Sequence, residues 1–174
     1  MQIISVESGG AQRDGVSPTT VSVLILLSPV VFICHFLEES PGFVDWFNSH
    51  VVPGITSDLF WTVNIFGLLI TVAVAAFEWT SRSSFSLSLA LAWLSFLMLA
   101  NAVFHLTAAF VDGRYVPGLG TAILLYLPFY GWLFWKAIKT HRINTVVLTA
   151  VTLAGAVPMF IHGYFILFRG TRLV

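Results

Sequence analysis

Two short stretches of this chain carry side chains that can exchange protons. His35 is followed by Glu38 and Glu39, at the i+3 and i+4 positions that share one face of a helix. Asn101 and His105 are likewise four residues apart. Carboxyl and imidazole groups in an apolar environment can hold different protonation states, so that one donates a proton while another stays an anion. The spacing therefore predicts an acid–base site built from two helices.

The helices that must position these groups are apolar enough to lie in a membrane. The 174 residues include only eight Lys or Arg and eight Asp or Glu, and the mean hydropathy is +0.91. A spanning helix needs about 20 mostly apolar residues, and five stretches qualify: 20–36, 60–77, 85–111, 118–138 and 145–168. The runs are continuously apolar rather than alternating, which disfavours a barrel. The sequence therefore predicts an all-α, polytopic membrane bundle of five transmembrane helices.

Polar segments mark the limits of the predicted bundle. Residues 1–19 form a polar N-terminal tail, residues 20–168 a single transmembrane helical domain, and residues 169–174 a short basic C-terminal tail. Residues 40–59 are too rich in Pro, Gly, Asp and Asn to span, yet they include clustered aromatic residues. This pattern predicts a short interfacial segment after the first helix, which either anchors at the headgroups or covers an opening there.

The polar groups inside the spans fall at a similar depth. At about 1.5 Å of rise per residue, His35, His105 and His162 lie about 22, 30 and 26 Å along three helices that run in one direction. Asn64 and Thr121 lie about 5–6 Å from the matching ends of the two antiparallel helices. Ionisable groups in hydrocarbon are costly and usually serve a function or a structural pair. We therefore expect one polar layer near the membrane face opposite the N-terminus.

The alternative interpretation gives each group a separate structural role. Glu39 would be a solvated helix end, and His35 a core histidine bonded to a carbonyl. Asn101 would join two helices by a hydrogen bond. Glu78, at the far end of the second span, is expected at the membrane interface.

Three motifs carry a resemblance to a known family. Residues 35–39 read H-x-x-E-E, residues 101–105 read N-A-x-x-H, and residues 117–121 read P-G-x-x-T. In this order, among hydrophobic helices, they resemble the HXXEE-domain family of small integral membrane proteins over about residues 24–168. The resemblance implies a common site, but no reaction, for His35, Glu38, Glu39, Asn101, His105 and Thr121. His162 lies outside the motifs, and its place rests on depth alone.

The first functional hypothesis is an enzyme that uses acid–base chemistry without a cofactor. It would isomerise, cyclise or hydrate a lipid or isoprenoid-like molecule entering from the bilayer. The catalytic residues would be His35, Glu38, Glu39, Asn101 and His105, and the substrate-binding residues Thr121, His162 and Asn64. More loosely, the chain is similar to the emopamil-binding sterol isomerases, five-helix membrane proteins with intramembrane His and Glu, although their His-to-Glu spacing is longer.

Two other hypotheses use the same layer. His and Glu at i, i+3 spacing recur in the metal sites of helix bundles. Zinc would make the protein a membrane hydrolase and iron an oxidase; the ligands would come from His35, Glu38, Glu39, His105 and His162. Alternatively, the layer holds a lipid or another apolar small molecule without reaction, in a binding or transport protein.

Charge bears on partners and orientation. The absence of a basic excess argues against nucleic acid as a partner, so the expected partners are membrane lipid, an apolar substrate and a second copy of the chain in a homodimer. Five basic residues fall on the N-terminal side of the predicted membrane and three on the other. The positive-inside rule then favours a cytoplasmic N-terminus. Reporter fusions at both termini test this, and a cytoplasmic C-terminus would contradict it.

Overall fold

The computed structural model describes residues 17–171, and every regular element within that range is helical. Five helical stretches are long and apolar enough to cross a membrane: Thr19–Glu39, Ser57–Ser81, Ser84–Asp112, Leu119–Lys139 and Thr145–Arg169. The predicted all-α fold with five membrane-spanning helices is confirmed, and the chain has the character of a multi-pass membrane protein. The predicted N-terminal tail lies outside the described residues except for its last three positions: Ser17 caps α1, and Pro18 and Thr19 already belong to it.

Each spanning stretch is a separate helix or a chain of helical segments. The first is α1 (Pro18–Glu39), followed by the short α2 (Phe43–Asn48) and then α3 (Ser57–Ser81). The third span joins α4 (Ser84–Leu94), η1 (Ser95–Ala100) and α5 (Asn101–Asp112). The fourth joins α6 (Leu119–Thr121), η2 (Ala122–Tyr126) and α7 (Leu127–Lys139), and the fifth joins α8 (Thr145–Tyr164) and η3 (Phe165–Arg169).

The helices begin at polar caps that the apolar pattern does not include. The side chains of Thr56 and Asn144 accept backbone hydrogen bonds from Leu59 and Val147 at the starts of α3 and α8. Ser83 forms a capping box at the start of α4. Such caps satisfy the free N–H groups of the first turn. For this reason α3 begins three residues before the predicted span.

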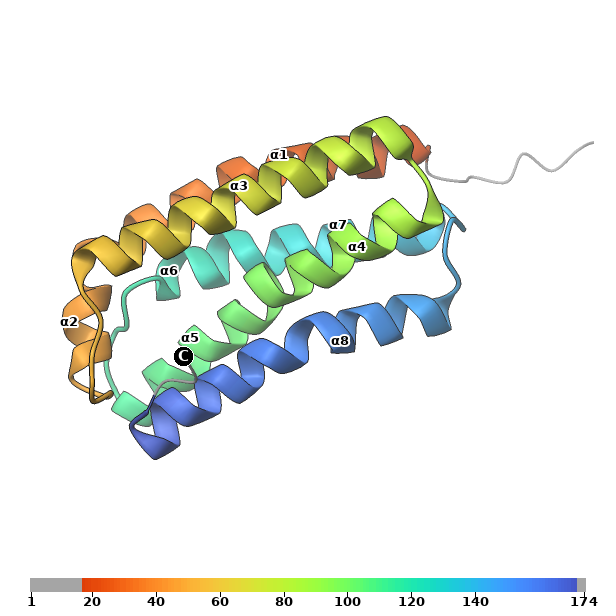
Figure 1. Cartoon of the computed structure of the whole chain (residues 1–174). Helices are drawn as coiled ribbons and strands as arrows, with labels where there is room; N and C mark the ends of the chain where they lie inside the picture. Colours follow the sequence, from red (N-terminus) through yellow and green to blue (C-terminus); the bar gives the residue numbers. More distant parts are fainter. Residues whose placement is uncertain (1–16, 172–174) are drawn as a thin grey trace, which may run out of the picture.

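The helices pack around two apolar clusters, with α1 and α3 antiparallel and α4 and α8 running in the same direction. Figure 1 shows α1 beside α3 and α4 beside α8; α3 packs against α4, and α7 packs against α1 and η1. The fully buried side chains include Leu87, Leu91, Leu94, Met98 and Leu133. The α4–α8 crossing is close because α8 has Gly155 there, whose Cβ would lie 2.0 Å from the carbonyl oxygen of Ala92.

Two spans change their helical pitch where the polar groups occur. The turns η1 and η2 are π-helical: η1 ends directly before Asn101, and η2 begins directly after Thr121. A π-helical turn inserts extra backbone into a helix and rotates the residues that follow, and it is frequent at functional sites. The faces that Asn101 and Thr121 present therefore differ from those of regular helices.

The segment between the first two spans folds back onto the protein. In α2, Trp46 and Phe47 are buried and pack with Phe104 and Ile166. Trp46 Nε1 donates a hydrogen bond to Asp112 at 2.7 Å. Of the two predicted roles for this segment, headgroup anchor or cover, these contacts favour the cover: α2 closes one end of the bundle (Figure 1).

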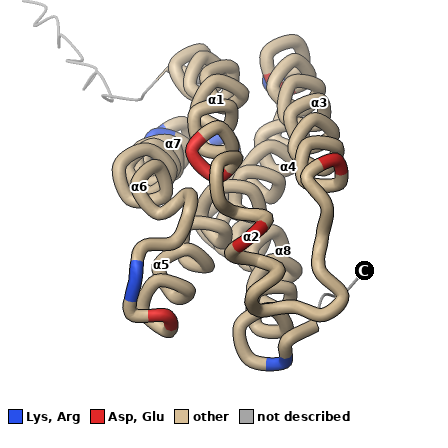
Figure 2. The backbone as a smooth tube through the Cα atoms, turned by 90° about the vertical axis from the view of Figure 1, so that its left-hand side faces the viewer, with Lys and Arg blue, Asp and Glu red and all other residues tan. Residues whose placement is uncertain are grey.

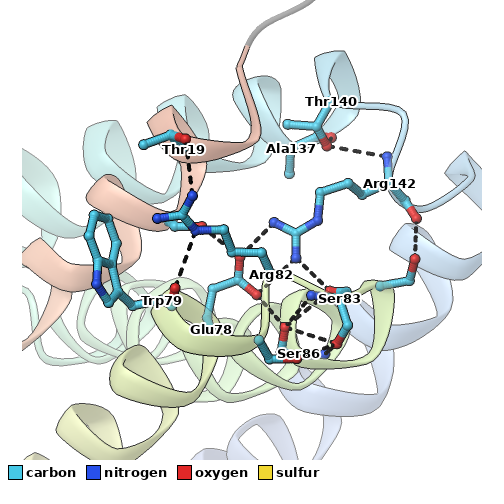
Figure 3. Close-up of polar contacts among 12 residues, drawn as sticks. Thr19, Glu78, Trp79, Arg82, Ser83, Ser86, Ala137, Thr140 and Arg142 are labelled. Carbon is cyan, nitrogen blue, oxygen red and sulfur yellow. Dashed lines mark hydrogen bonds and ion pairs between the residues drawn. The ribbon is translucent and has the colours of Figure 1, made fainter.

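The opposite end of the bundle carries a buried ion pair. Glu78, near the end of α3, is fully buried inside the protein. Arg142, in the loop between α7 and α8, donates two hydrogen bonds to its carboxylate at 2.6 and 3.0 Å. The hydroxyls of Ser22 and Ser86 donate two more, at 2.8 and 2.5 Å, and Figure 3 shows the convergence of Glu78, Ser86 and Arg142. The network joins α1, α3, α4 and that loop.

Candidate functional site

The last turn of α1 presents its two carboxylates in different directions. Figure 2 looks onto this end of the bundle and shows the acidic end of α1 close to α2 and α6. Glu39 lies one turn after His35 and shares its inward face. Glu38 is rotated by about 100° from its neighbour, as any adjacent helical residue is. The two carboxylates consequently have separate sets of partners.

Glu39 lies between two histidines that are fully buried. Its Oε1 atom is 3.4 Å from His35 Nε2 and 3.0 Å from His105 Nε2. His35 and His105 are 0% exposed and Glu39 is 6% exposed, so the interpretation of Glu39 as a solvated helix end is wrong. The rings of the two histidines meet edge to face, with centroids 5.0 Å apart. The structure thus joins the ends of α1 and α5 through one buried cluster.

The ring of His35 is held from three sides. Its Nδ1 atom lies 2.8 Å from Thr121 Oγ1, and its Nε2 atom lies 3.1 Å from Asn101 Nδ2. The ring of Tyr126 packs against it with a centroid distance of 4.1 Å. Both ring nitrogens contact side chains, so the interpretation of His35 as a core histidine bonded to a carbonyl is also wrong.

Glu38 is fixed at the start of the fourth span. Its carboxylate accepts backbone hydrogen bonds from Gly120 at 2.9 Å and from Thr121 at 2.6 Å. The hydroxyls of Thr121 and Tyr115 also donate to it. Free N–H groups at a helix start favour an anion, and four donors stabilise the ionised carboxylate. Glu38 is therefore a fixed anion outside the histidine cluster.

Tyr115 is a part of the site that the sequence analysis did not identify. Tyr115 is 59% exposed, yet desolvation of its hydroxyl, the hydrogen bond to Glu38 and the charge of that carboxylate raise the pKa of Tyr115 to about 12. The hydroxyl therefore remains a donor to Glu38 at neutral pH. A tyrosine two residues before a P-G turn offers no sequence signal of its own, because its partner lies 77 positions away.

Gly118 lets the same turn pass close to the cluster. Its φ of +92° lies in the left-handed region. A Cβ on Gly118 would lie 2.6 Å from His105 Cε1 and 2.9 Å from Glu39 Cγ. The P-G-x-x-T motif marks this position, but only the structure shows that the glycine covers His105 and Glu39.

These contacts define the direction of a hydrogen-bond chain. Thr121 donates its hydroxyl hydrogen to Glu38, so it accepts from His35 Nδ1 at 2.8 Å. In a neutral His35 ring the Nε2 lone pair then points toward Asn101 and Glu39. The chain Glu38–Thr121–His35 thus orients one ring nitrogen into the cluster.

An apolar cavity of about 780 Å³ opens beside this cluster. Glu39, Asn101, Asn64 and His162 line it together with Thr62. Its aromatic walls come from Phe32, Phe43, Phe47, Phe60, Phe66, Trp93, Phe96 and Phe104. The α3 residues Val63 and Phe66 in the wall are 60% and 61% exposed, so the cavity reaches the side of the bundle. In a membrane that side faces lipid.

The predicted site residues fall into three groups. The buried cluster and its hydrogen-bond partners are His35, Glu39, Asn101, His105 and Thr121. Glu38 lies behind Thr121, away from the cavity lining. Asn64 and His162 lie on the cavity walls contributed by α3 and α8, and Asn64 Nδ2 donates to Phe60 O at 3.0 Å.

The five predicted metal ligands do not converge as one set. Within residues 17–171, ligand atoms that lie within 4.8 Å of one another come from His35, Glu39 and His105 alone. The oxygens of Glu38 are engaged by hydrogen-bond donors. His162 lies on the cavity wall on α8 and is not in the set.

Comparison with known proteins gives one match. A family model described as "Protein of unknown function with HXXEE motif" matches residues 26–133. Neither a curated protein nor a solved structure matches the chain. The matched range contains His35, Glu38, Glu39, Asn101, His105 and Thr121, but not His162.

Proposed function

The chain belongs to the family of proteins of unknown function with the HXXEE motif, and from its own side chains we propose an intramembrane enzyme with acid–base chemistry. Its substrate is an apolar, isoprenoid-like lipid. The reaction is a double-bond isomerisation or a cyclisation. The observation that carries the proposal is a buried carboxylate, Glu39, at the polar end of a large apolar cavity.

Glu39 is the group that exchanges the proton. It lines the cavity, and its Oε1 atom faces the two histidines, so the other oxygen is left for the substrate. Asn101 lines the cavity beside it and orients the His35 ring. A buried acid that moves a proton in a dry site is a general means of catalysis.

Glu38 and Thr121 act through His35 as positioning residues. The anion of Glu38 holds Thr121, and Thr121 holds the Nδ1 side of the ring. When Nε2 of His35 takes up the proton that Glu39 releases, the positive charge on the ring is stabilised at short range by the Glu38 anion through Thr121. The two neighbouring glutamates thus have the different roles expected of them, a proton carrier and a fixed anion.

The cavity walls support the choice of an isoprenoid-like substrate. Eight aromatic side chains line the cavity, and aromatic faces attract cationic centres by about 0.5–2 kcal/mol. Protonation of an alkene by Glu39 produces a carbocation beside such faces. Loss of a proton from a neighbouring carbon back to the carboxylate completes an isomerisation, with all atoms and charges balanced and no co-reactant. The lipid enters between α3 and α8, past the exposed wall residues Val63 and Phe66.

A carboxylate-to-amide exchange tests the proposal. Cells that express the wild type are compared with cells that express Glu39→Gln by lipid and isoprenoid profiling. We expect a product that depends on the wild type and falls at least about 100-fold with Glu39→Gln, the low end for loss of a general acid. Asp45→Asn is the matched control, because Asp45 is an exposed carboxylate on α2.

Two outcomes contradict the proposal. Lipid pools that are the same with and without the wild-type protein exclude turnover. If a lipid also co-purifies with that protein, the chain is a binding protein and the cavity is its ligand site. Equal turnover by Glu39→Gln and the wild type removes the assigned role of Glu39.

A further inference from the structure

We infer that His35, Glu39 and His105 together bind one first-row divalent metal ion, zinc or ferrous iron. This inference rests on the proposed function because it names an occupant of the same site. It narrows five predicted ligands to three, and it assigns the atoms: the Nε2 atoms of both histidines and Oε1 of Glu39.

Two of the three distances between the donor atoms are close to those that a metal ion needs, and all three atoms lie within 4.8 Å of one another. Ligands held about 2.0–2.1 Å from a tetrahedral ion are about 3.3–3.4 Å apart. Oε1 of Glu39 lies 3.4 Å from His35 Nε2 and 3.0 Å from His105 Nε2. Two histidines and one carboxylate are also the donor set of catalytic zinc sites and of ferrous oxygenase sites, both of which leave positions open. Here Glu39 and Asn101 line the cavity, so the open position faces it.

His105 gives an independent argument. Both of its ring nitrogens are buried without a hydrogen-bond partner, although Nε2 is 3.0 Å from Glu39 Oε1. The ring is thus close to the carboxylate but wrongly oriented for an N–H···O bond. A buried polar atom without a partner is costly. A metal ion bound by the Nε2 lone pair satisfies that nitrogen without an N–H group.

The surroundings of His35 match the outer shell of a metal site. Metal-binding histidines almost always donate the other ring N–H to an oxygen atom, which fixes the tautomer. His35 Nδ1 contacts Thr121 Oγ1 at 2.8 Å, and Thr121 in turn donates to Glu38. The Nε2 lone pair is thereby directed toward Glu39. The amide of Asn101, 3.1 Å from that nitrogen, can rotate so that its oxygen faces the ion.

The charge partners of the two buried glutamates also support a metal ion at Glu39. Glu78 is paired with the guanidinium of Arg142. Among the described residues the arginine ion pairs are with Glu78 and Asp112, and none of them is with Glu39. The ion-pair partners of Glu39 are His35 and His105, which carry a positive charge only when protonated, and a buried anion needs a positive partner. A divalent ion supplies that charge with both histidines neutral, together with a bound water that can carry a proton.

Metal content and cobalt spectroscopy test the inference on the full chain in detergent. After chelation, the protein is loaded separately with Zn²⁺, Fe²⁺ and Co²⁺ and measured by mass spectrometry of the metal. We expect about one ion per chain for the preferred metal, visible absorption bands of bound Co²⁺, and a lower unfolding temperature after chelation. Which metal is retained by protein purified without loading distinguishes zinc from iron.

Variants of individual histidines identify the ligands. His105→Ala and His105→Gln both lose the ion, and the second keeps most of the side-chain volume. Thr121→Val keeps the ligands but weakens the affinity by about 10–100-fold, the usual cost of losing an outer-shell partner. His162→Ala and His50→Ala are the matched controls, because these histidines lie outside the cluster, and both retain the ion.

The outcomes separate this inference from the proposed function. Less than about 0.1 ion per chain after loading, with no cobalt bands, overturns the metal site. If that metal-free preparation still turns over lipid, the proposed enzymatic function stands without the metal. Stoichiometric metal with unchanged lipid pools supports the metal site and contradicts the proposed enzymatic function. Metal retained by both His105 variants shows that the ion lies elsewhere and also overturns the inference.

Discussion

At the scale of single residues, the environment gives neighbouring glutamates different chemistry. Glu38 accepts four hydrogen bonds at the start of the fourth span, which occupy the acceptor sites of its carboxylate. Glu39 faces two imidazoles and lines the cavity. An approximately 100° step between adjacent helical residues produces this separation. Substitutions at the two positions should therefore differ in effect: at Glu38 they disturb geometry, and at Glu39 they remove the proposed proton carrier.

Gly118 offers a test of how tightly the cluster is packed. In Gly118→Ala the new methyl group meets His105 and Glu39 at less than 3.0 Å, so the cluster must move. In Gly113→Ala, also at positive φ, nothing lies within 4 Å of the new atom. Both variants lose about 1–2 kcal/mol of stability to left-handed strain. Only Gly118→Ala should also lose lipid turnover, as measured by the profiling assay. Equal turnover by both variants would contradict the close approach.

At the scale of elements, the site depends on helices that are neither straight nor regular. The π-helical turns η1 and η2 adjoin Asn101 and Thr121. Each turn offsets the residues beyond it from the register that a regular helix would give. The close crossing of α4 and α8 at Gly155 holds the third and fifth spans together, and residues of both line the cavity. Helix spacing and helix pitch together set the shape of the cavity.

The α4–α8 crossing can be tested with a matched pair of glycines. Gly155→Ala places a methyl group 2.0 Å from the backbone oxygen of Ala92, so two backbones must separate. We expect a loss of about 1–3 kcal/mol, the usual cost of overpacking. Gly131→Ala, in α7, meets nothing within 4 Å and should gain up to about 1 kcal/mol from helix propensity. Thermal unfolding in detergent measures both, and an unchanged midpoint for Gly155→Ala would count against the crossing.

At the scale of the whole molecule, each end of the bundle has its own buried glutamate. The end with α2 holds the cavity, the histidines and Glu39. The other end is closed by Glu78 and Arg142, which tie together four parts of the chain (Figure 3). The carboxylate of Glu78 accepts four hydrogen bonds, whereas Nε of Arg142 is buried without a partner, and the pair lies away from the cavity lining. Its role is therefore to hold the helices in place at the end away from the site.

Removal of one partner tests that role. Arg142→Met leaves the buried carboxylate of Glu78 without its cation, and the expected loss is about 3–5 kcal/mol of unfolding free energy. The double variant Glu78→Gln with Arg142→Met removes the charge as well and should recover part of that loss. Thermal unfolding of the three proteins in detergent gives the comparison. A single variant as stable as the wild type would mean that the pair is dispensable.

The fold was largely accessible from the sequence, and the helix ends were its least certain part. Runs of about 20 apolar residues determine membrane spans locally, since lipid leaves no other solution for the backbone. The caps lie outside those runs, which is why α3 starts at Ser57 rather than near Phe60. The position of residues 40–59 against the bundle depends on tertiary contacts, because the burial of Trp46 and Phe47 requires α5 and η3 as partners.

The sequence by itself determined which polar residues share a depth in the membrane, because depth follows from position along a helix of known rise. Only the tertiary structure decided which way each of them faces. In the structure Glu39 faces the histidines and Glu38 faces the start of the fourth span. Tyr115 and Gly118 lie at the site, and Glu78 pairs with Arg142. Most of those contacts join residues 64 to 83 positions apart; the exceptions are Gly118 with His105, 13 positions apart, and Glu39 with His35, within one helical turn. They depend on how the helices rotate and pack against one another, which no local pattern of residue types encodes.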